Sequence, residues 1–99
     1  MKVAAIIPAR YESTRFPGKP LADVAGKPMI RRIYEQVKLC PDIDEVIVAT
    51  DDERIRKACE SFGAPVAMTG ADCRSGTDRV AQAAAATDAD AVINVQGDQ

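Results

Sequence analysis

Histidine is absent from this chain of 99 residues, and its absence excludes several kinds of active site. A Ser-His-Asp triad, a Cys-His pair and a histidine metal site all need a residue that the chain does not contain. A metal ion would therefore bind to carboxylates, and oxygen ligands of this kind favour Mg²⁺. The chemistry to look for is one that proceeds without a histidine base.

Cysteine is scarce, and its spacing does not suit a structural role. The chain has three cysteines, Cys40, Cys59 and Cys73, an odd number without any C-x-x-C spacing. This pattern indicates neither a disulfide framework nor a zinc knuckle. We expect all three thiols to be reduced, with Cys59 packed within a helix, and none to be reactive, since no histidine is there to activate a thiol.

Long apolar runs and an excess of positive charge are also missing. No stretch approaches the roughly 18 apolar residues of a membrane span. Met1-Lys2 leads directly into a predicted strand, without the apolar region of a signal peptide. The net charge of −2 provides no basic field for nucleic acid. With 46% apolar and 28% charged residues, the sequence is typical of one globular domain, which we expect in the cytoplasm without nucleic-acid or membrane partners.

The common nucleotide-binding strings G-x-G-x-x-G and G-x-x-x-x-G-K-[ST] do not occur. What is present is a cationic loop after the first apolar run, with Arg10, Arg15 and Lys19. Together with the hydroxyls of Ser13 and Thr14 and with free backbone N–H groups, these cations predict a site for a polyphosphate. The residues alone leave a second interpretation open, in which the cations are surface charges on a turn stiffened by prolines.

The hydrophobic pattern alternates between strand and helix along the chain. Four apolar segments predict strands, over residues 2–7, 45–49, 65–68 and 91–95. Three further segments predict helices, over residues 28–39, 52–62 and 76–86. This alternation requires a parallel sheet with right-handed crossovers, which is a Rossmann-like α/β half with the strand order 3-2-1-4.

The ends of the second helix carry recognisable signals. Thr50 and Glu53 have the spacing of a capping box, in which the hydroxyl serves one helix N–H and the glutamate reaches back. A helix cap then also explains Asp51 and Asp52. Gly63 suits a left-handed cap at the other end of this helix.

Polar segments follow all four predicted strand ends, which is where open parallel sheets bind their ligands. They are the cationic loop, residues 50–51, residues 69–77 and residues 96–98. Asp98 comes directly after Gly97 and could hold Mg²⁺ against phosphates, although a helix cap or a solvated strand end explains a single aspartate more simply. We therefore expect four separate segments to converge at one edge of the sheet.

A family resemblance is carried by five strings, IPARYESTRFPGKPL, AGKPMI, IVATDD, MTGADCRSGTDR and INVQGD, which together span nearly the whole chain. They closely resemble the N-terminal part of the 3-deoxy-manno-octulosonate cytidylyltransferases. Sialic-acid cytidylyltransferases share IPAR but diverge after it, and sugar-1-phosphate nucleotidyltransferases have a loop richer in glycine. The resemblance implies an incomplete sheet of the nucleotide-diphospho-sugar transferase (GT-A-like) type, with residues 1–99 as the N-terminal nucleotide-binding half of a longer domain.

The same resemblance implies a role for each matching residue. Arg10, Lys19 and Asp98 would be catalytic, because the two cations would hold the β- and γ-phosphates and Asp98 would bind the Mg²⁺ cofactor. The family's second metal-binding aspartate lies far downstream and is absent from this chain. The segment around Gly76 would lie against the cytosine and ribose, although Ser75 also has the spacing to cap the third helix. The implied nucleotide-binding set is Pro8, Ala9, Arg10, Ser13, Thr14, Lys19, Arg74, Ser75, Gly76 and Gln96.

The implied reaction transfers CMP from CTP to the anomeric hydroxyl of 3-deoxy-manno-octulosonate and releases pyrophosphate, for lipopolysaccharide biosynthesis. Gln99, where many relatives carry glutamate, leaves open whether the sugar acid is instead the 8-amino analogue. Two other hypotheses remain, namely another nucleotidyltransferase that makes CMP-sialic acid or an NDP-sugar, and a non-catalytic nucleotide-binding module. We expect a homodimer for the full-length protein and no turnover by these residues alone.

Overall fold

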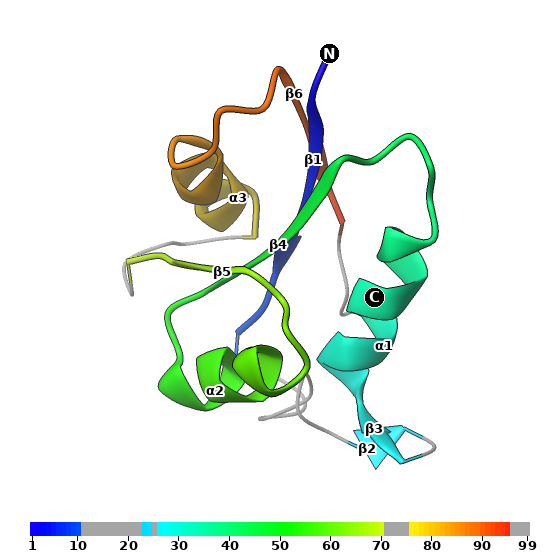
Figure 1. The fold of residues 1–99 in the computed structure, drawn as a ribbon. Coiled ribbons are helices and arrows are strands. Elements are labelled where there is room, and N and C mark those ends of the chain that lie inside the picture. Colours follow the sequence, from blue (N-terminus) through cyan, green and yellow to red (C-terminus); the bar gives the residue numbers. More distant parts are fainter. Residues whose placement is uncertain (11–22, 25, 71–75, 96–99) are drawn as a thin grey trace.

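The computed structural model describes residues 1–10, 23–24, 26–70 and 76–95. Within these ranges the chain forms a parallel sheet with helices on both faces, together with a short two-stranded ribbon (Figure 1). The strands are β1 (Val3–Pro8), β2 (Asp23–Val24), β3 (Lys27–Pro28), β4 (Glu45–Thr50), β5 (Val66–Met68) and β6 (Ala91–Asn94). The helices are α1 (Met29–Lys38), α2 (Glu53–Ser61) and α3 (Gly76–Ala84).

The main sheet has the order β5-β4-β1-β6, and every pairing in it is parallel. These are, in that order, the third, second, first and fourth of the strands expected from the sequence. The labels differ only because β2 and β3, which were not predicted, lie between the first and the second. The predicted α/β class with a parallel sheet is therefore confirmed.

The central strands bury side chains on both faces, which explains their continuous apolar runs. In β4, Val46 and Val48 belong to one core, and Ile47 and Ala49 belong to the other. The first core is completed by residues of α1 and α2, and the second by residues of α3. The sheet thus lies between α1 and α2 on one face and α3 on the other (Figure 1).

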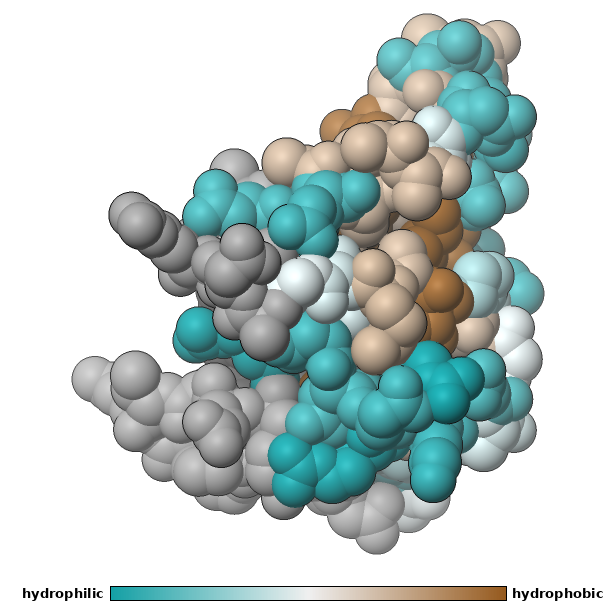
Figure 2. Space-filling model, turned by 90° about the vertical axis from the view of Figure 1, so that its left-hand side faces the viewer, coloured by the Kyte–Doolittle hydropathy of each residue, from teal (hydrophilic) through white to brown (hydrophobic). Residues whose placement is uncertain are grey.

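Helix α2 is polar over most of its surface. The segment ERIRKACES forms α2, and its buried residues are only Ile55 and Cys59. In Figure 2 the strongest hydrophilic colouring lies at the level of α2, and paler and apolar residues lie above it. The outer surface of α2 is therefore a charged, solvated face.

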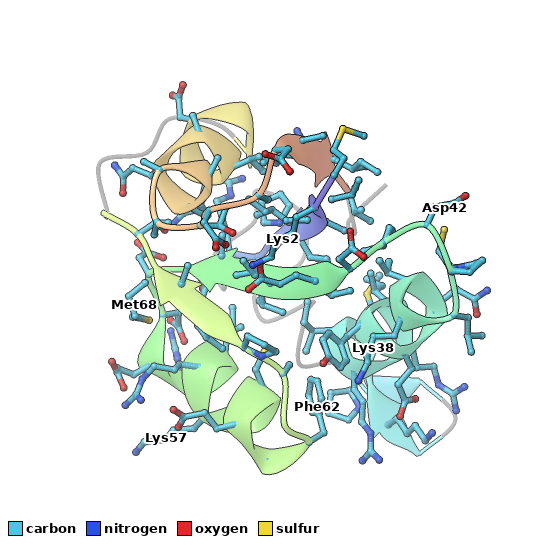
Figure 3. All side chains as sticks on the ribbon, turned by 45° about the horizontal axis from the view of Figure 1, so that its top comes forward. Lys2, Lys38, Asp42, Lys57, Phe62 and Met68 are labelled. Carbon is cyan, nitrogen blue, oxygen red and sulfur yellow. The ribbon has the colours of Figure 1, made fainter. Side chains whose placement is uncertain are left out.

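Helix α1 begins after Pro28, which is its N-cap rather than the first helical residue that the sequence predicts. Its buried residues, Ile30 and Tyr34, stand one turn apart and face the sheet. Tyr34 also meets Phe62 of the α2 terminus, with ring centroids 5.6 Å apart. Figure 3 shows Phe62 and Lys38 on this side of the molecule, where α1 and α2 approach each other.

The capping box predicted for α2 is wrong in its residues. Asp52, not Thr50, is the N-cap, and its carboxylate accepts hydrogen bonds from the backbone N–H groups of Arg54 at 2.8 Å and Ile55 at 3.2 Å. The strand β4 continues to Thr50, one residue further than predicted. The left-handed residue expected at the other end is confirmed, because Gly63 has φ +79°.

The ribbon of β2 and β3 was not predicted from the sequence. Its two strands pair antiparallel, Asp23 with Pro28 and Val24 with Lys27. Gly26 has φ +89°, a conformation that side-chain-bearing residues rarely adopt, so glycine suits this turn.

Cys59 is 0% exposed within α2, as the sequence predicts. Burial raises the pKa of its thiol to about 11, so the thiolate is scarce at neutral pH. Among the described residues, no helix is long and apolar enough to cross a membrane.

Candidate functional site

The four parallel strands all end at one edge of the sheet, and hydrogen bonds join the residues that leave it. The backbone N–H of Ala9 donates to the carbonyl of Ala49 at 2.9 Å. The N–H of Thr69 donates to the carbonyl of Thr50 at 2.9 Å, and that of Val95 donates to the carbonyl of Ile6 at 3.0 Å. The first residues of three of the polar segments expected to converge, and Val95 just before the fourth, are therefore side by side at this carboxyl edge.

Four of the predicted site residues lie in the described ranges. Pro8 ends β1, Ala9 is 4% exposed, and Arg10 is exposed at the carboxyl edge. Gly76 is the first residue of α3. Ala9 and Arg10 follow β1 directly, as a phosphate-binding turn at this edge requires.

The other predicted site residues lie outside the described ranges, and their roles remain predictions. They are Ser13, Thr14, Lys19, Arg74, Ser75, Gln96 and Asp98, together with Arg15 of the cationic loop.

Thr50 and Asp52 organise the exit of β4. Thr50 is 0% exposed, and its hydroxyl accepts a hydrogen bond from the N–H of Asp52 at 3.2 Å. The guanidinium of Arg54 donates to the Asp52 carboxylate, and this bond, with the two backbone donors of the helix cap, holds the pKa of Asp52 below its usual value. Asp52 is thus an ionised cap at the edge of the site.

Asp51 has a partner that the sequence analysis missed. Its carboxylate lies 3.5 Å from the guanidinium of Arg79, which also donates to the hydroxyl of Thr69 at 2.5 Å. The helix cap proposed for both aspartates therefore explains Asp52 alone. Arg79 is the one cation in the segment GTDRVAQAA of α3, and this was the signal that could have drawn attention to it.

The described carboxylates offer little to a metal ion. No group of three or more Cys, Asp or Glu side chains suitable for a metal occurs in the described ranges. Asp52 is engaged by the helix cap and Asp51 by Arg79, so neither of these two carboxylates is unpaired.

Comparison with known proteins identifies the family. The family model described as "Cytidylyltransferase" matches residues 4–99 of the chain. The chain belongs to the cytidylyltransferase family. In the described ranges of this family member, the IPAR turn, the β4 exit and the start of α3 lie together at the carboxyl edge of a parallel sheet.

Individual relatives within the family are similar over the whole chain. The 3-deoxy-manno-octulosonate cytidylyltransferase of Geobacter metallireducens is 57% identical over 100% of this chain, which covers 39% of that protein. The 8-amino-3,8-dideoxy-manno-octulosonate cytidylyltransferase of Shewanella frigidimarina is also 57% identical, and the chain covers 42% of it. The chain thus spans about two fifths of the length of these relatives.

A solved structure of a relative has the same fold. The CMP:2-keto-3-deoxy-manno-octonic acid synthetase complexed with CTP matches with a TM-score of 0.96 and 47% identity, over 100% of this chain and 41% of that one. The resemblance stated from the sequence strings is therefore confirmed at the level of family and fold.

Proposed function

We propose that the full-length protein transfers CMP from CTP to 3-deoxy-manno-octulosonate, or to its 8-amino analogue, and so supplies an activated sugar acid for lipopolysaccharide biosynthesis. The observation that carries the proposal is the 57% identity, over the whole chain, to relatives named for these two activities. The similar structure complexed with CTP supports the choice of nucleotide.

The reaction joins the anomeric hydroxyl oxygen of the sugar acid to the α-phosphorus of CTP. The bond from that phosphorus to the oxygen bridging to the β-phosphate breaks, and pyrophosphate leaves with the electron pair. The hydroxyl proton passes to solvent. Because negative charge spreads over the phosphoryl oxygens and the leaving group, positioned cations and N–H groups are sufficient catalysts, and no histidine is needed.

The chain's own residues would bind and orient the nucleotide at the carboxyl edge. Arg10 and Lys19 would hold the β- and γ-phosphates, and the turn that begins at Pro8 would contribute backbone N–H groups with Ser13 and Thr14. Ala9 is buried, which fixes the start of this turn. Arg74, Ser75 and Gly76 would lie against the cytosine and ribose, and Gln96 would lie near the nucleotide and the sugar.

Asp98 would hold a Mg²⁺ ion against the triphosphate. Such an ion, when bound, neutralises charge on the phosphate oxygens. The family resemblance of the segment INVQGD is what assigns this role to Asp98, and Asp51 and Asp52 are already paired with other groups. The second ligand would come from elsewhere in the full-length protein.

Residues 1–99 would form the N-terminal nucleotide-binding half of the cytidylyltransferase domain. The sugar-acid pocket and the subunit interface of a homodimer would belong to the remaining length of the protein. We place the enzyme in the cytoplasm, where CTP is available.

A pyrophosphate-release assay on the complete open reading frame tests the proposal. It uses CTP, Mg²⁺ and a panel of sugar acids, and then compares CTP with UTP, GTP and dTTP. Release that depends on 3-deoxy-manno-octulosonate or its 8-amino analogue, with CTP preferred, is the expected result. Preference for sialic acid or a sugar 1-phosphate would assign another nucleotidyltransferase, and the absence of release with every acceptor would overturn the enzymatic proposal.

A further inference from the structure

Arg79 is the most deeply buried charged residue in the described part of the chain. Only 2% of it is exposed, although it lies in the first turns of α3, close to the carboxyl edge. Its neighbours Val80 and Ala83 pack on the sheet through the core formed with Ile6, Ile47 and Ala49. The guanidinium thus lies at the end of an apolar interface, where an isolated charge is unfavourable.

The guanidinium of Arg79 joins the exits of two strands. It donates to the hydroxyl of Thr69, the first residue after β5, and it lies 3.5 Å from the carboxylate of Asp51, the first residue after β4. The N–H of Thr69 is itself bonded to the carbonyl of Thr50, which ends β4. One side chain of α3 therefore holds both strand ends at a fixed separation.

Gln82 adds a second tie between α3 and the exit of β5. Its side-chain oxygen accepts a hydrogen bond from the backbone N–H of Gly70 at 2.7 Å. Arg79 and Gln82 are three residues apart, so they project from the same side of the helix. Thr69 and Gly70, which begin the segment leading to α3, are thus each bonded to that helix.

Stability alone gives a weak reason for an arginine at this position. A buried ion pair recovers little of the cost of removing its charges from water, and well-packed apolar residues of similar volume often serve as well. The Nε atom of Arg79 has no hydrogen-bond partner among the described residues. What the guanidinium provides, and an apolar side chain cannot, is a directed attachment to Thr69 and Asp51 together.

We infer that Arg79 is a positioning residue for the nucleotide, an inference that rests on the proposed function. It fixes the first turn of α3, and with it Gly76, against the exits of β4 and β5. Gly76 belongs to the segment proposed to lie against cytosine. Loss of the attachment should therefore weaken CTP binding and reduce the preference for CTP over UTP. It should slow the chemical step less.

The test compares Arg79→Met, Arg79→Lys and Thr69→Val in the complete open reading frame, assayed well below the melting temperature of each variant. Methionine keeps an unbranched side chain of similar length without the donors, and valine removes only the hydroxyl acceptor from Thr69. For Arg79→Met we expect the KM for CTP to rise about tenfold, with kcat within about threefold, because a small misplacement of a binding group is costly. The ratio of kcat/KM for CTP to that for UTP should fall, and lysine should restore part of both losses.

The matched control is Arg56→Met on the solvated face of α2, where Arg56 pairs with Glu53 and Glu60. It should leave the KM and the CTP preference unchanged. A lower melting temperature in Arg79→Met with an unchanged KM would overturn the inference, and so would equal losses for CTP and UTP. If Arg79→Met does not fold, an unchanged KM in Thr69→Val overturns it.

The wild-type assay separates this inference from the proposed function. If the wild-type enzyme turns over and Arg79→Met keeps the wild-type KM and CTP preference, the positioning role alone is overturned. If the wild-type protein binds CTP without turnover, equilibrium titration with CTP and UTP replaces kinetics as the readout, and the same loss of affinity and preference is expected. A wild-type protein that binds no nucleotide overturns both.

Discussion

At the amino edge of the sheet, Lys2 pairs with Asp88 and Glu45 through side chains that are 40%, 84% and 30% exposed. At the carboxyl edge, Arg79 is 2% exposed and pairs with Asp51, which is 27% exposed. The first set is open to water and screened by salt, whereas in the second the guanidinium of Arg79 is shielded from both. Loss of an ion pair should therefore cost little at the amino edge and more at the carboxyl edge, where the remaining charge is buried.

The amino edge can exchange partners at little cost. The N–H groups of Lys2 and Val3 donate to the carboxylates of Asp90 and Asp44, both at 2.7 Å, and all of these groups are near solvent. At the carboxyl edge, removal of Asp51 or Thr69 leaves the buried guanidinium of Arg79 without one of its partners. The comparison teaches that functional variants should be sought at the carboxyl edge and controls at the amino edge.

The largest effect is expected when residues 1–99 are tested without the rest of the full-length protein. We expect residues 1–99 alone to bind CTP weakly or not at all and to release no pyrophosphate, since the chain covers 39% and 42% of its relatives. Calorimetric titration with CTP and Mg²⁺, alongside the release assay, measures both. Affinity in the micromolar range would contradict this prediction.

A charge removed from the proposed phosphate turn should affect catalysis far more than one removed from the amino edge. Lys19→Ala in the full-length enzyme should lower kcat by about a hundredfold, the usual loss when one electrostatic stabiliser of the transition state is removed. Lys2→Ala is the matched control and should leave kcat unchanged. Equal kcat values for the two variants would remove Lys19 from the mechanism.

The helix cap at the carboxyl edge should contribute measurably to stability. Asp52→Ala leaves the N–H groups of Arg54 and Ile55 without their acceptor and should lower the free energy of unfolding by about 1 kcal/mol. Urea unfolding of the full-length protein measures the change. Asp88→Ala at the amino edge is the comparison and should have no measurable effect, and a loss as large as that of Asp52→Ala would show that exposure does not distinguish the edges.

The smallest effect is the pH dependence of that cap. The hydrogen bond from Arg54, followed by the backbone donors, lowers the pKa of Asp52 in the folded chain. Its contribution to stability is therefore complete above the ordinary pKa of 3.8 and is lost as the pH falls through the lower folded value. In thermal melts below pH 4, Asp52→Asn should lose less stability than the wild-type protein. An equal fall in melting temperature for the two proteins below pH 4 would contradict this assignment.

The strands and the order of the sheet could be predicted because their signals are local and repeated. In EVIVA the four residues after Glu45 are all apolar, which is the pattern of a strand covered on both faces, and in β4 these four residues are divided between the two cores. Alternation with helices then leaves few topologies to consider. The ribbon was missed because strands of two residues, such as Asp23–Val24, are too short to show any period.

The carboxyl edge was harder to predict because its contacts depend on distance in space. Thr50 and Asp52 both precede the helix with plausible capping side chains, and one additional residue of β4 decides between them. The partnership of Arg79 with Thr69 and Asp51 joins three segments, and nothing in the local pattern around any of them indicates the other two. The residue types of this site were visible in the sequence, but their pairing was not.

The register of the sheet has a consequence for the order in which the protein forms. β1 pairs with β4 through Ala4 and Glu45, and with β6 through Val3 and Ala91. During synthesis the first strand can gain one neighbour once residue 50 has left the ribosome, but its second only after residue 94 has done so. The edge of β1 that pairs with β6 therefore stays unpaired until nearly all of these residues have been made. Contacts of such long separation also slow folding.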